Sequence, residues 1–196
     1  MKPWPQALCH RSRRSAECER ADEPAVRRCE RTGRLGKDLC CPTVAQALGV
    51  PLISKDAIKE ALFDAVGFGD WALSKTLSRA ADVAMVHIAR DLDRAVLDNF
   101  WYAETVVDLL APLPGPFVEV FCHCDPNVAF ERFRRRGRHP GHADEERDVE
   151  ARRAAFFARA EKLPLQMLGP IVEVDTERPV DVASVATRVV EAAKRA

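Results

Sequence analysis

The sequence predicts an α/β protein in which a parallel sheet is flanked by helices. Two observations lead to this prediction. Short apolar runs typical of buried strands recur from residue 43 onward, and segments with the helical spacing of apolar residues separate them. Since successive parallel strands need crossover connections, the alternation favours one open parallel sheet. The predicted strands are residues 50–54, 95–98, 117–122 and 171–175.

Helices are predicted in the intervals around these strands. Gly49 is a suitable end for the first helix, because glycine adopts the left-handed conformation common at helix C-termini. Asp125 and Pro126 suit the start of another, since aspartate caps helices and proline fits the first turn. A polar loop at residues 138–142 follows that helix. The predicted helices are residues 43–48, 57–65, 73–91, 125–137, a segment ending near residue 161, and 180–193.

Length and composition bound the kind of protein. With 196 residues and 47% hydrophobic content, the chain can form one domain with a substantial core. We expect this domain at residues 31–196, whereas residues 1–30 are too polar to order themselves and predict a disordered or atypical extension. The apolar runs are far shorter than the roughly twenty residues of a membrane span, and no secretory h-region is present, which favours a cytoplasmic protein.

The charge balance argues against two classes of partner. Thirty basic and thirty acidic side chains leave no net field that would recruit nucleic acid or an anionic membrane. The seven cysteines lack the paired spacing of zinc-ribbon ligands, so we expect thiols rather than a metal site or a disulfide framework. Any phosphate binding must therefore be local and cannot depend on the overall charge of the protein.

Residues 31–39, RTGRLGKDL, resemble part of a phosphate-binding loop. In the pattern G-x-x-x-x-G-K-[S/T], glycine amides surround phosphates, the lysine contacts the β- and γ-oxygens, and the hydroxyl binds Mg²⁺. Gly36 and Lys37 fit the end of this pattern, and Gly33 adds a second glycine. However, Arg31 replaces the first glycine and Asp38 replaces the hydroxyl residue. On these residues alone, a nucleotide site and a coincidence both remain open.

A set of downstream motifs is more specific than this loop. The runs TVAQALGVPLISKDAIKEALFDAVGFGD, VLDNFW, VEVFCHCDPNVAFERFRRRGRHPGH and IVEVDT occur in this order. Over about residues 43–180 they resemble the P-loop small-molecule kinases, ATP-dependent phosphotransferases related to gluconate and chloramphenicol kinases and often grouped with AAA-family ATPases. The resemblance implies a three-layer P-loop NTPase-type sheet, a small helical lid at about residues 132–160, and ATP and Mg²⁺ as cofactors.

The loop spacing agrees with this resemblance although the loop residues do not. In that family the loop lysine lies twelve residues before the glycine that ends the first helix, and Lys37 lies twelve residues before Gly49. Two explanations remain open. The loop has diverged in a relative that binds nucleotide poorly, or a frame error upstream of about residue 43 has replaced the native strand and loop.

The resemblance also implies roles for side chains at the predicted strand ends, where open parallel sheets bind their ligands. Asp56 would orient or deprotonate the acceptor hydroxyl, although an aspartate here could instead cap the following helix. Lys59 would hold an anionic or polar acceptor, or lie in solvent. Asn99 and Phe100 would begin a loop beside the acceptor. Asp98 would hold Mg²⁺, or simply end its strand.

The basic run after residue 131 would bind phosphate. Arginine forks match phosphate oxygens bidentately, so the resemblance makes Arg135, Arg136 and Arg138 a phosphate clamp. On a continuous helix, Arg132 would share a face with Arg135 and Arg136. The alternative is a solvated helix paired with nearby acids. Arg135, Arg138 and Lys37 would join Asp56 in catalysis, and the other implied cofactor-binding residues are Gly33, Gly36, Asp38, Asp175 and Thr176.

The sequence thus predicts an ATP-dependent kinase acting on a hydroxyl of a small molecule. The alternatives are a catalytically silent relative that serves as a binding or interaction module, and a frame-disrupted version of the kinase. A nucleic-acid binder led by the basic N-terminal residues is disfavoured, because no aromatic residues alternate with the arginines to stack on bases.

Overall fold

The computed structural model describes residues 36–143, 148–160, 164–166 and 168–195. All of them belong to one compact unit, Thr32–Ala196. The predicted extension at residues 1–30 lies outside the described residues. In chain order the elements are α1 (Gly36–Leu48), β1 (Leu52–Ser54), α2 (Lys55–Val66), α3 (Trp71–Ala89), β2 (Val96–Asp98), α4 (Val106–Leu110), β3 (Glu119–His123), α5 (Pro126–Arg135), the 3₁₀ helix η1 (Pro140–His142), α6 (Val149–Ala160), β4 (Ile171–Asp175) and α7 (Val182–Ala193).

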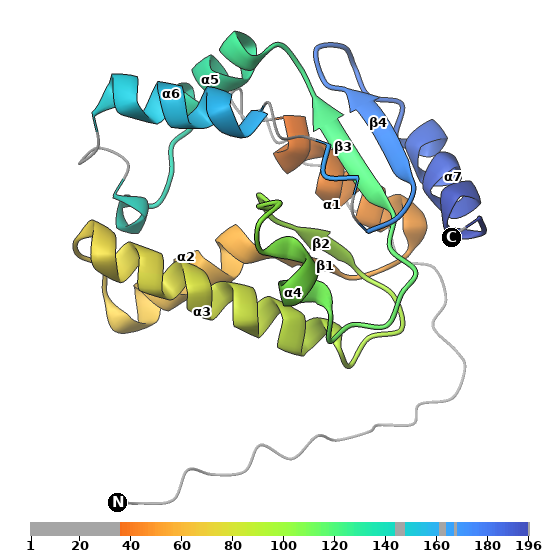
Figure 1. The fold of residues 1–196 in the computed structure, drawn as a ribbon, viewed down its shortest axis with the longest axis horizontal. Coiled ribbons are helices and arrows are strands. Elements are labelled where there is room, and N and C mark those ends of the chain that lie inside the picture. Colours follow the sequence, from red (N-terminus) through yellow and green to blue (C-terminus); the bar gives the residue numbers. More distant parts are fainter. Residues whose placement is uncertain (1–35, 144–147, 161–163, 167, 196) are drawn as a thin grey trace, which may run out of the picture. The chain divides into compact units, whose positions relative to one another are not determined.

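The α/β class is confirmed, and the strands pair in parallel (Figure 1). β1 pairs with β2 so that Ser54 lies opposite Asp98, and β3 pairs with β4 so that His123 lies opposite Asp175. Within the described residues these pairs form two separate two-stranded sheets, so the single continuous three-layer sheet is not confirmed. The strand that should precede the phosphate loop would lie before Gly36, outside the described residues.

Helices α1 and α7 cover β3 and β4. On β4, Val172 and Val174 are buried while Glu173 and Asp175 are exposed, which is the pattern of a strand with one face in the core. These two valines pack with Val44 of α1 and Val185 of α7. The same core includes Cys40, so α1 is held by its apolar face to the second sheet.

Helices α3 and α4 pack beside β1 and β2 (Figure 1). Ile53 of β1 contacts Met85, which is fully buried in α3. The neighbouring Val86 packs with Val106 and Leu110 of α4, a helix that the sequence pattern did not indicate. Apolar residues at helical spacing along α3 therefore hold the first sheet in place. Of the described helices, none combines the length and the apolar character needed to cross a bilayer.

The helix boundaries follow local capping chemistry. The predicted start of α5 is confirmed, because the Asp125 carboxylate accepts hydrogen bonds from Asn127 N at 2.8 Å and Val128 N at 3.3 Å. The predicted start of α1 at residue 43 is wrong, since the helix begins at Gly36 and continues through Pro42. Proline lacks the amide hydrogen and usually starts or breaks a helix, and this makes the boundary difficult to predict.

Candidate functional site

The candidate site begins at the carboxyl ends of β1 and β2. Ser54 ends β1, and its Oγ donates a hydrogen bond to Asp98 Oδ2 at 3.2 Å. Ser54 is also the N-cap of α2, but its hydroxyl makes no capping bond to the helix. The two strand ends are therefore joined by side chains, and α2 starts directly beside Asp98.

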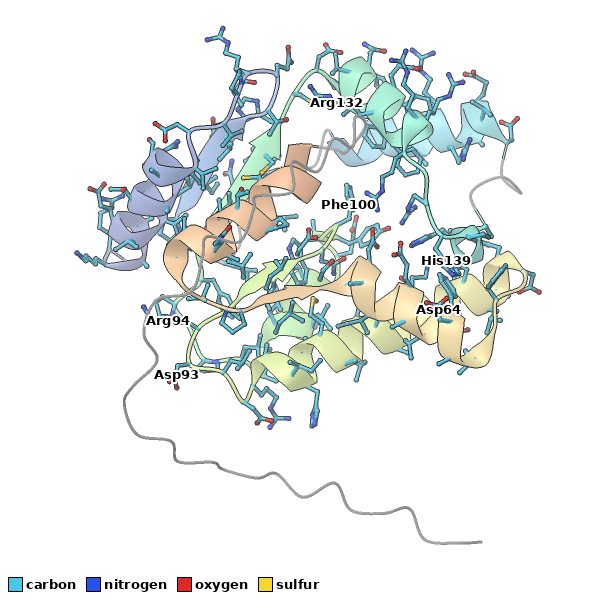
Figure 2. The ribbon with its side chains drawn as sticks, turned by 180° about the vertical axis from the view of Figure 1, so that it is seen from behind. Asp64, Asp93, Arg94, Phe100, Arg132 and His139 are labelled. Atoms are coloured by element: carbon cyan, nitrogen blue, oxygen red, sulfur yellow. The ribbon has the colours of Figure 1, made fainter. Side chains whose placement is uncertain are left out.

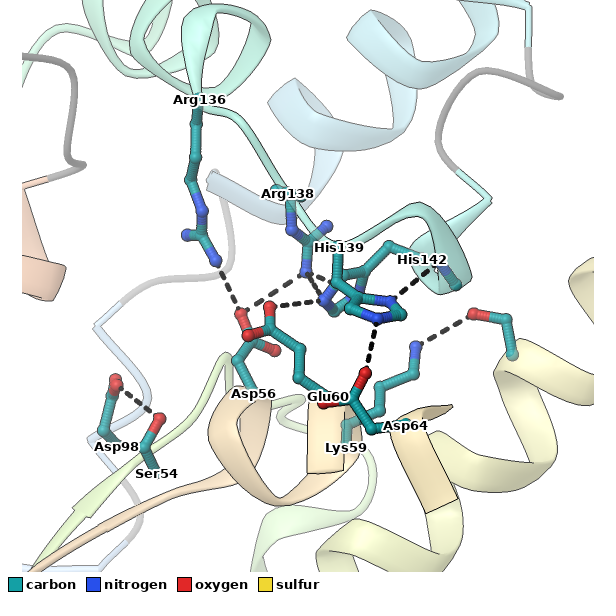
Figure 3. A network of polar contacts seen from close by, with 12 residues as sticks. Ser54, Asp56, Lys59, Glu60, Asp64, Asp98, Arg136, Arg138, His139 and His142 are labelled. Atoms are coloured by element: carbon teal, nitrogen blue, oxygen red, sulfur yellow. Dashed lines mark hydrogen bonds and ion pairs between the residues drawn. The ribbon is translucent and has the colours of Figure 1, made fainter. Parts of the chain in front are cut away.

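Asp56 lies in the first turn of α2, and its carboxylate accepts hydrogen bonds from two arginines. Its Oδ2 is 2.9 Å from Arg136 Nη2 and 3.3 Å from Arg138 Nη2 (Figure 3). The capping alternative for Asp56 is wrong, because Ser54 occupies the cap position. Both arginines are mostly buried, so these charge-assisted hydrogen bonds are only weakly screened by solvent.

The arginines reach Asp56 because α5 ends just before them. Arg135 is the last helical residue, and Arg136 has extended backbone torsions, with ψ near 120°. From this point the chain leaves the α5 axis and runs over α2 as residues 136–142, which we call the lid segment (Figure 3). The helix end therefore directs Arg136 and Arg138 to one carboxylate.

Three acids on α2 face the lid segment. They are spaced four residues apart, at 56, 60 and 64, and so share one face of the helix. His142 Nε2 is 3.1 Å from Glu60 Oε1, and His139 Nε2 is 3.2 Å from Asp64 Oδ1 (Figures 2 and 3). Together with Asp56, these contacts match each acid with a basic side chain of the lid segment.

Phe63 forms the apolar centre of the same interface. Its ring is 1% exposed, stacks on His139 with centroids 5.2 Å apart, and meets His142 edge to face at 5.5 Å. Gly141 lies directly on the ring, where a Cβ would come within 2.5 Å of Phe63 Cγ. The lid segment therefore fits α2 closely only because residue 141 has no side chain.

Two lysines of α2, the helix that carries Asp56 and Phe63, are also buried. Lys59 is 7% exposed and donates to Ser74 Oγ at 3.0 Å, so the alternative of a solvent-exposed lysine is wrong. Lys55 pairs with Asp82 at 2.9 Å, and Asn99 Nδ2 donates to the same carboxylate at 3.0 Å. The Asn99 amide, predicted to contact substrate, thus fixes the loop after β2 to α3.

The described contacts of four other predicted site residues are with residues other than Asp56. Arg135 is 79% exposed and pairs with Glu131 of its own helix at 4.0 Å. Phe100 packs edge to face with Tyr102, and their ring centroids are 5.6 Å apart. Asp175 ends β4, and Thr176 donates from both N and Oγ1 to His123 O. The Asp175–Thr176 segment therefore continues the pairing of β3 with β4.

The predicted phosphate-loop residues lie at the edge of the described part of the chain. Gly33 lies outside the described residues. Gly36 begins α1, followed by Lys37 and Asp38, whose side chains lie outside what the structure describes. Their roles in phosphate binding stay predictions.

Sequence reasoning gave no role to Glu60 or His142, and it did not foresee the contact that Arg132 makes. Arg132 Nη1 donates to Thr176 O at 3.2 Å, linking α5 to the end of β4. In the part of the chain that the structure describes, no group of three metal-ligating side chains occurs. The signal that could have found Glu60 was its spacing of four residues from Asp56 and from Asp64.

Burial lowers the pKa of His142 below its ordinary value of 6.5. The nearby Arg138 guanidinium lowers it further, and Lys59 adds a smaller effect of the same sign. The hydrogen bond to Glu60 and the charge of Asp56 oppose this shift without reversing it. The lowered pKa favours the neutral form of the buried His142 imidazole.

Comparison with known proteins agrees with this architecture. No family model matches the chain, and no curated protein matches it. Among solved structures, it is similar to a protein of Chloroflexus aurantiacus J-10-fl described as a putative kinase, with 25% identity and a TM-score of 0.64. The match covers 80% of this chain and 91% of that one. The chain has a kinase-like fold.

Proposed function

We propose that this protein is an ATP- and Mg²⁺-dependent phosphotransferase of the P-loop small-molecule kinase type, acting on a hydroxyl group. The observation that carries the proposal is the convergence of Arg136 and Arg138 on Asp56 at the start of α2. A carboxylate beside two guanidinium groups offers both a proton acceptor and a phosphate clamp. The likeness to the Chloroflexus protein supports a kinase reaction over other chemistry.

Phosphoryl transfer depends mainly on positioning and charge neutralisation. In the proposed reaction the acceptor oxygen forms a bond to the γ-phosphorus, and the bond to the β–γ bridging oxygen breaks. Asp56 orients the acceptor hydroxyl and takes its proton. Arg136 and Arg138 bind phosphate oxygens, for which their planar forks are suited. When bound, MgATP supplies the phosphoryl group, and the metal neutralises part of its charge.

The chemistry of the donor groups fits these cofactors. Mg²⁺ commonly takes one or two protein carboxylates and completes its shell with phosphate and water. Asp98 is such a carboxylate, and its contact with Ser54 holds it at the strand edge. Lys37 lies in the first turn of α1, where a phosphate-binding lysine is expected after its loop. Asp38 beside it would oppose a triphosphate.

Isothermal titration with MgATP tests the proposal. We expect binding by the wild-type protein and a loss of about 10- to 100-fold in affinity for Arg138→Ala, corresponding to about 1.5–3 kcal/mol for a charged hydrogen bond. Arg188→Ala is the matched control, because this arginine is exposed on α7 and has no assigned role in the site, and we expect a change of less than about threefold. No binding at millimolar MgATP would refute the proposal.

The second candidate is a silent relative that uses the same fold as a binding module. It is favoured by Arg31 and Asp38, which replace a glycine and a hydroxyl residue of the loop pattern. The double variant Arg31→Gly with Asp38→Ser separates the candidates. If wild type does not bind MgATP and the variant does, only the loop is impaired. If neither binds, the silent module is the better description.

A further inference from the structure

A chain of four side chains connects two acids of α2 through the lid segment. Asp56 Oδ2 is 3.3 Å from Arg138 Nη2, and the same Nη2 is 2.8 Å from His142 Nδ1. The opposite nitrogen of the ring, Nε2, is 3.1 Å from Glu60 Oε1 (Figure 3). His142 is 3% exposed, so it is the most deeply buried polar residue of this chain of contacts.

We propose that His142 is a positioning residue, which holds the Arg138 guanidinium in place for phosphate beside Asp56. This inference rests on the proposed function. His142 itself would contact neither substrate nor nucleotide and would act through Arg138.

The partners of the ring determine its protonation state. Arg138 Nη2 lies 2.8 Å from Nδ1 and 3.4 Å from Nε2. Because arginine has only donors, Nδ1, the nearer nitrogen, is the acceptor when Nε2 faces Glu60. A carboxylate accepts, so Nε2 carries the hydrogen that is donated to Glu60. The neutral Nε2–H tautomer therefore satisfies both contacts. A protonated ring would place an N–H and a positive charge against the guanidinium and would lose the shorter of these contacts.

Packing fixes the direction of the ring. Phe63 contacts the imidazole edge to face, and Gly141, the residue before His142, lies directly on the Phe63 ring. His139 Nδ1 accepts from Gly141 N at 3.0 Å, which tightens the turn before His142. These contacts fix the position of the imidazole, and the hydrogen bond from Arg138 Nη2 to the ring then fixes the position of the guanidinium.

The two distances to Arg138 Nη2 indicate how the arrangement would work. The contact with His142 is shorter than the contact with Asp56, 2.8 Å against 3.3 Å. A phosphate could therefore replace Asp56 as an acceptor while His142 keeps the guanidinium in position. That exchange would leave the Asp56 carboxylate available to an acceptor hydroxyl. Preorganised donors of this kind need little rearrangement during reaction.

The first test is nitrogen-detected NMR of the histidines in the full chain, which needs no ligand. We expect His142 as the neutral Nε2–H tautomer at pH 7. Arg138→Met should raise its titration midpoint, because a positive neighbour is removed, and Glu60→Gln should lower it. The titrating and charged groups that face the ring are Arg138 on the lid segment and Asp56, Lys59 and Glu60 on α2. An Nδ1–H tautomer, or a charged ring at pH 7, would overturn the inference.

The second test measures MgATP affinity in His142→Leu and His142→Asn. Asparagine can place an acceptor oxygen where Nδ1 lies, so we expect it to keep most of the affinity, whereas leucine should lose about tenfold or more. His87→Leu, at an exposed position of α3, is the matched control and should stay within about twofold. Equal affinities of the leucine variant and wild type would refute the positioning role.

The two tests separate failure of this inference from failure of the proposed function. If wild type binds no MgATP, the kinase proposal fails and the positioning role falls with it, even where NMR reports the expected tautomer. If wild type binds and the tautomer is wrong, only the inference fails. Should His142→Leu not fold, the NMR test in Glu60→Gln still decides, because this acid is at the surface and its loss leaves the core intact.

Discussion

Replacing Gly141 by alanine should separate the lid segment from α2. A Cβ at this position would lie 2.5, 2.6 and 2.7 Å from three atoms of the Phe63 ring. Carbon atoms in contact normally lie about 3.5–4.0 Å apart, so the groups must separate by roughly 1 Å. Phe63 is enclosed on all sides and cannot give way easily. Gly141 has no positive φ, so alanine meets no backbone strain there, and the effect is purely steric.

Overpacking of this kind costs about 1–3 kcal/mol of unfolding free energy. Alanine also restricts the unfolded chain, which returns about 0.4–1 kcal/mol. We therefore expect Gly141→Ala to destabilise the protein by about 1–2 kcal/mol in urea unfolding, with an unchanged m-value. Gly137→Ala is the matched control, because its Cβ would meet nothing within 4 Å, and we expect no loss.

A double-mutant cycle identifies the partner of the new methyl group. In a Phe63→Leu background the ring is gone, so the penalty of Gly141→Ala should shrink, with a coupling energy of about 0.5 kcal/mol or more. Equal stabilities of Gly141→Ala and Gly137→Ala would refute the close packing of the lid segment on α2. A penalty that persists unchanged without the ring would show that the methyl group clashes with something else.

Three further predictions concern stability. Lys55→Met should lower the free energy of unfolding by about 2–3 kcal/mol, measured in urea, because the largely buried Asp82 carboxylate loses its ion pair. The control Lys75→Met, at an exposed site of α3, should lower it by less than about 0.5 kcal/mol. Asp125→Ala should cost about 1 kcal/mol, since two amides of α5 lose their cap, and thermal unfolding checks this. Because the pKa of His142 is lowered on folding, its contribution to stability is complete above about pH 6.5 and is lost as the pH falls. Stability curves of wild type and His142→Asn should therefore converge at acidic pH, and parallel curves would contradict this.

The elements that could be predicted from sequence are those determined by local chemistry. The strand β4 was predicted with the observed bounds, because alternating valines at 172 and 174 bury one face. The cap at Asp125 followed from its side chain and the proline after it. Both depend on neighbours within a few residues, which the sequence shows directly.

The candidate site was predictable only in part, because its contacts are long range. Asp56 was singled out, but its partner Arg138 is 82 residues away in the chain. Glu60 and His142 are equally distant from each other, and no local spacing in the sequence joins them. Whether a lysine such as Lys59 is buried also depends on the helix packed against it, here α3. Such contacts need the fold before they can be inferred.

The basic run illustrates why one helix end matters so much. Helical periodicity places Arg132, Arg135 and Arg136 on one face, yet the structure sends each to a different environment. Arg132 binds the Thr176 carbonyl, Arg135 lies in solvent, and Arg136 reaches Asp56 because the helix has stopped. If the helix continued, Arg136 would lie on the same helix face as Arg132 and Arg135. The end of α5 therefore leaves Arg132 at the end of β4 and brings Arg136 and Arg138 to Asp56, just after β1. We expect a phosphate bound beside Asp56 to contact Arg136 and Arg138, the arginines that follow the end of α5.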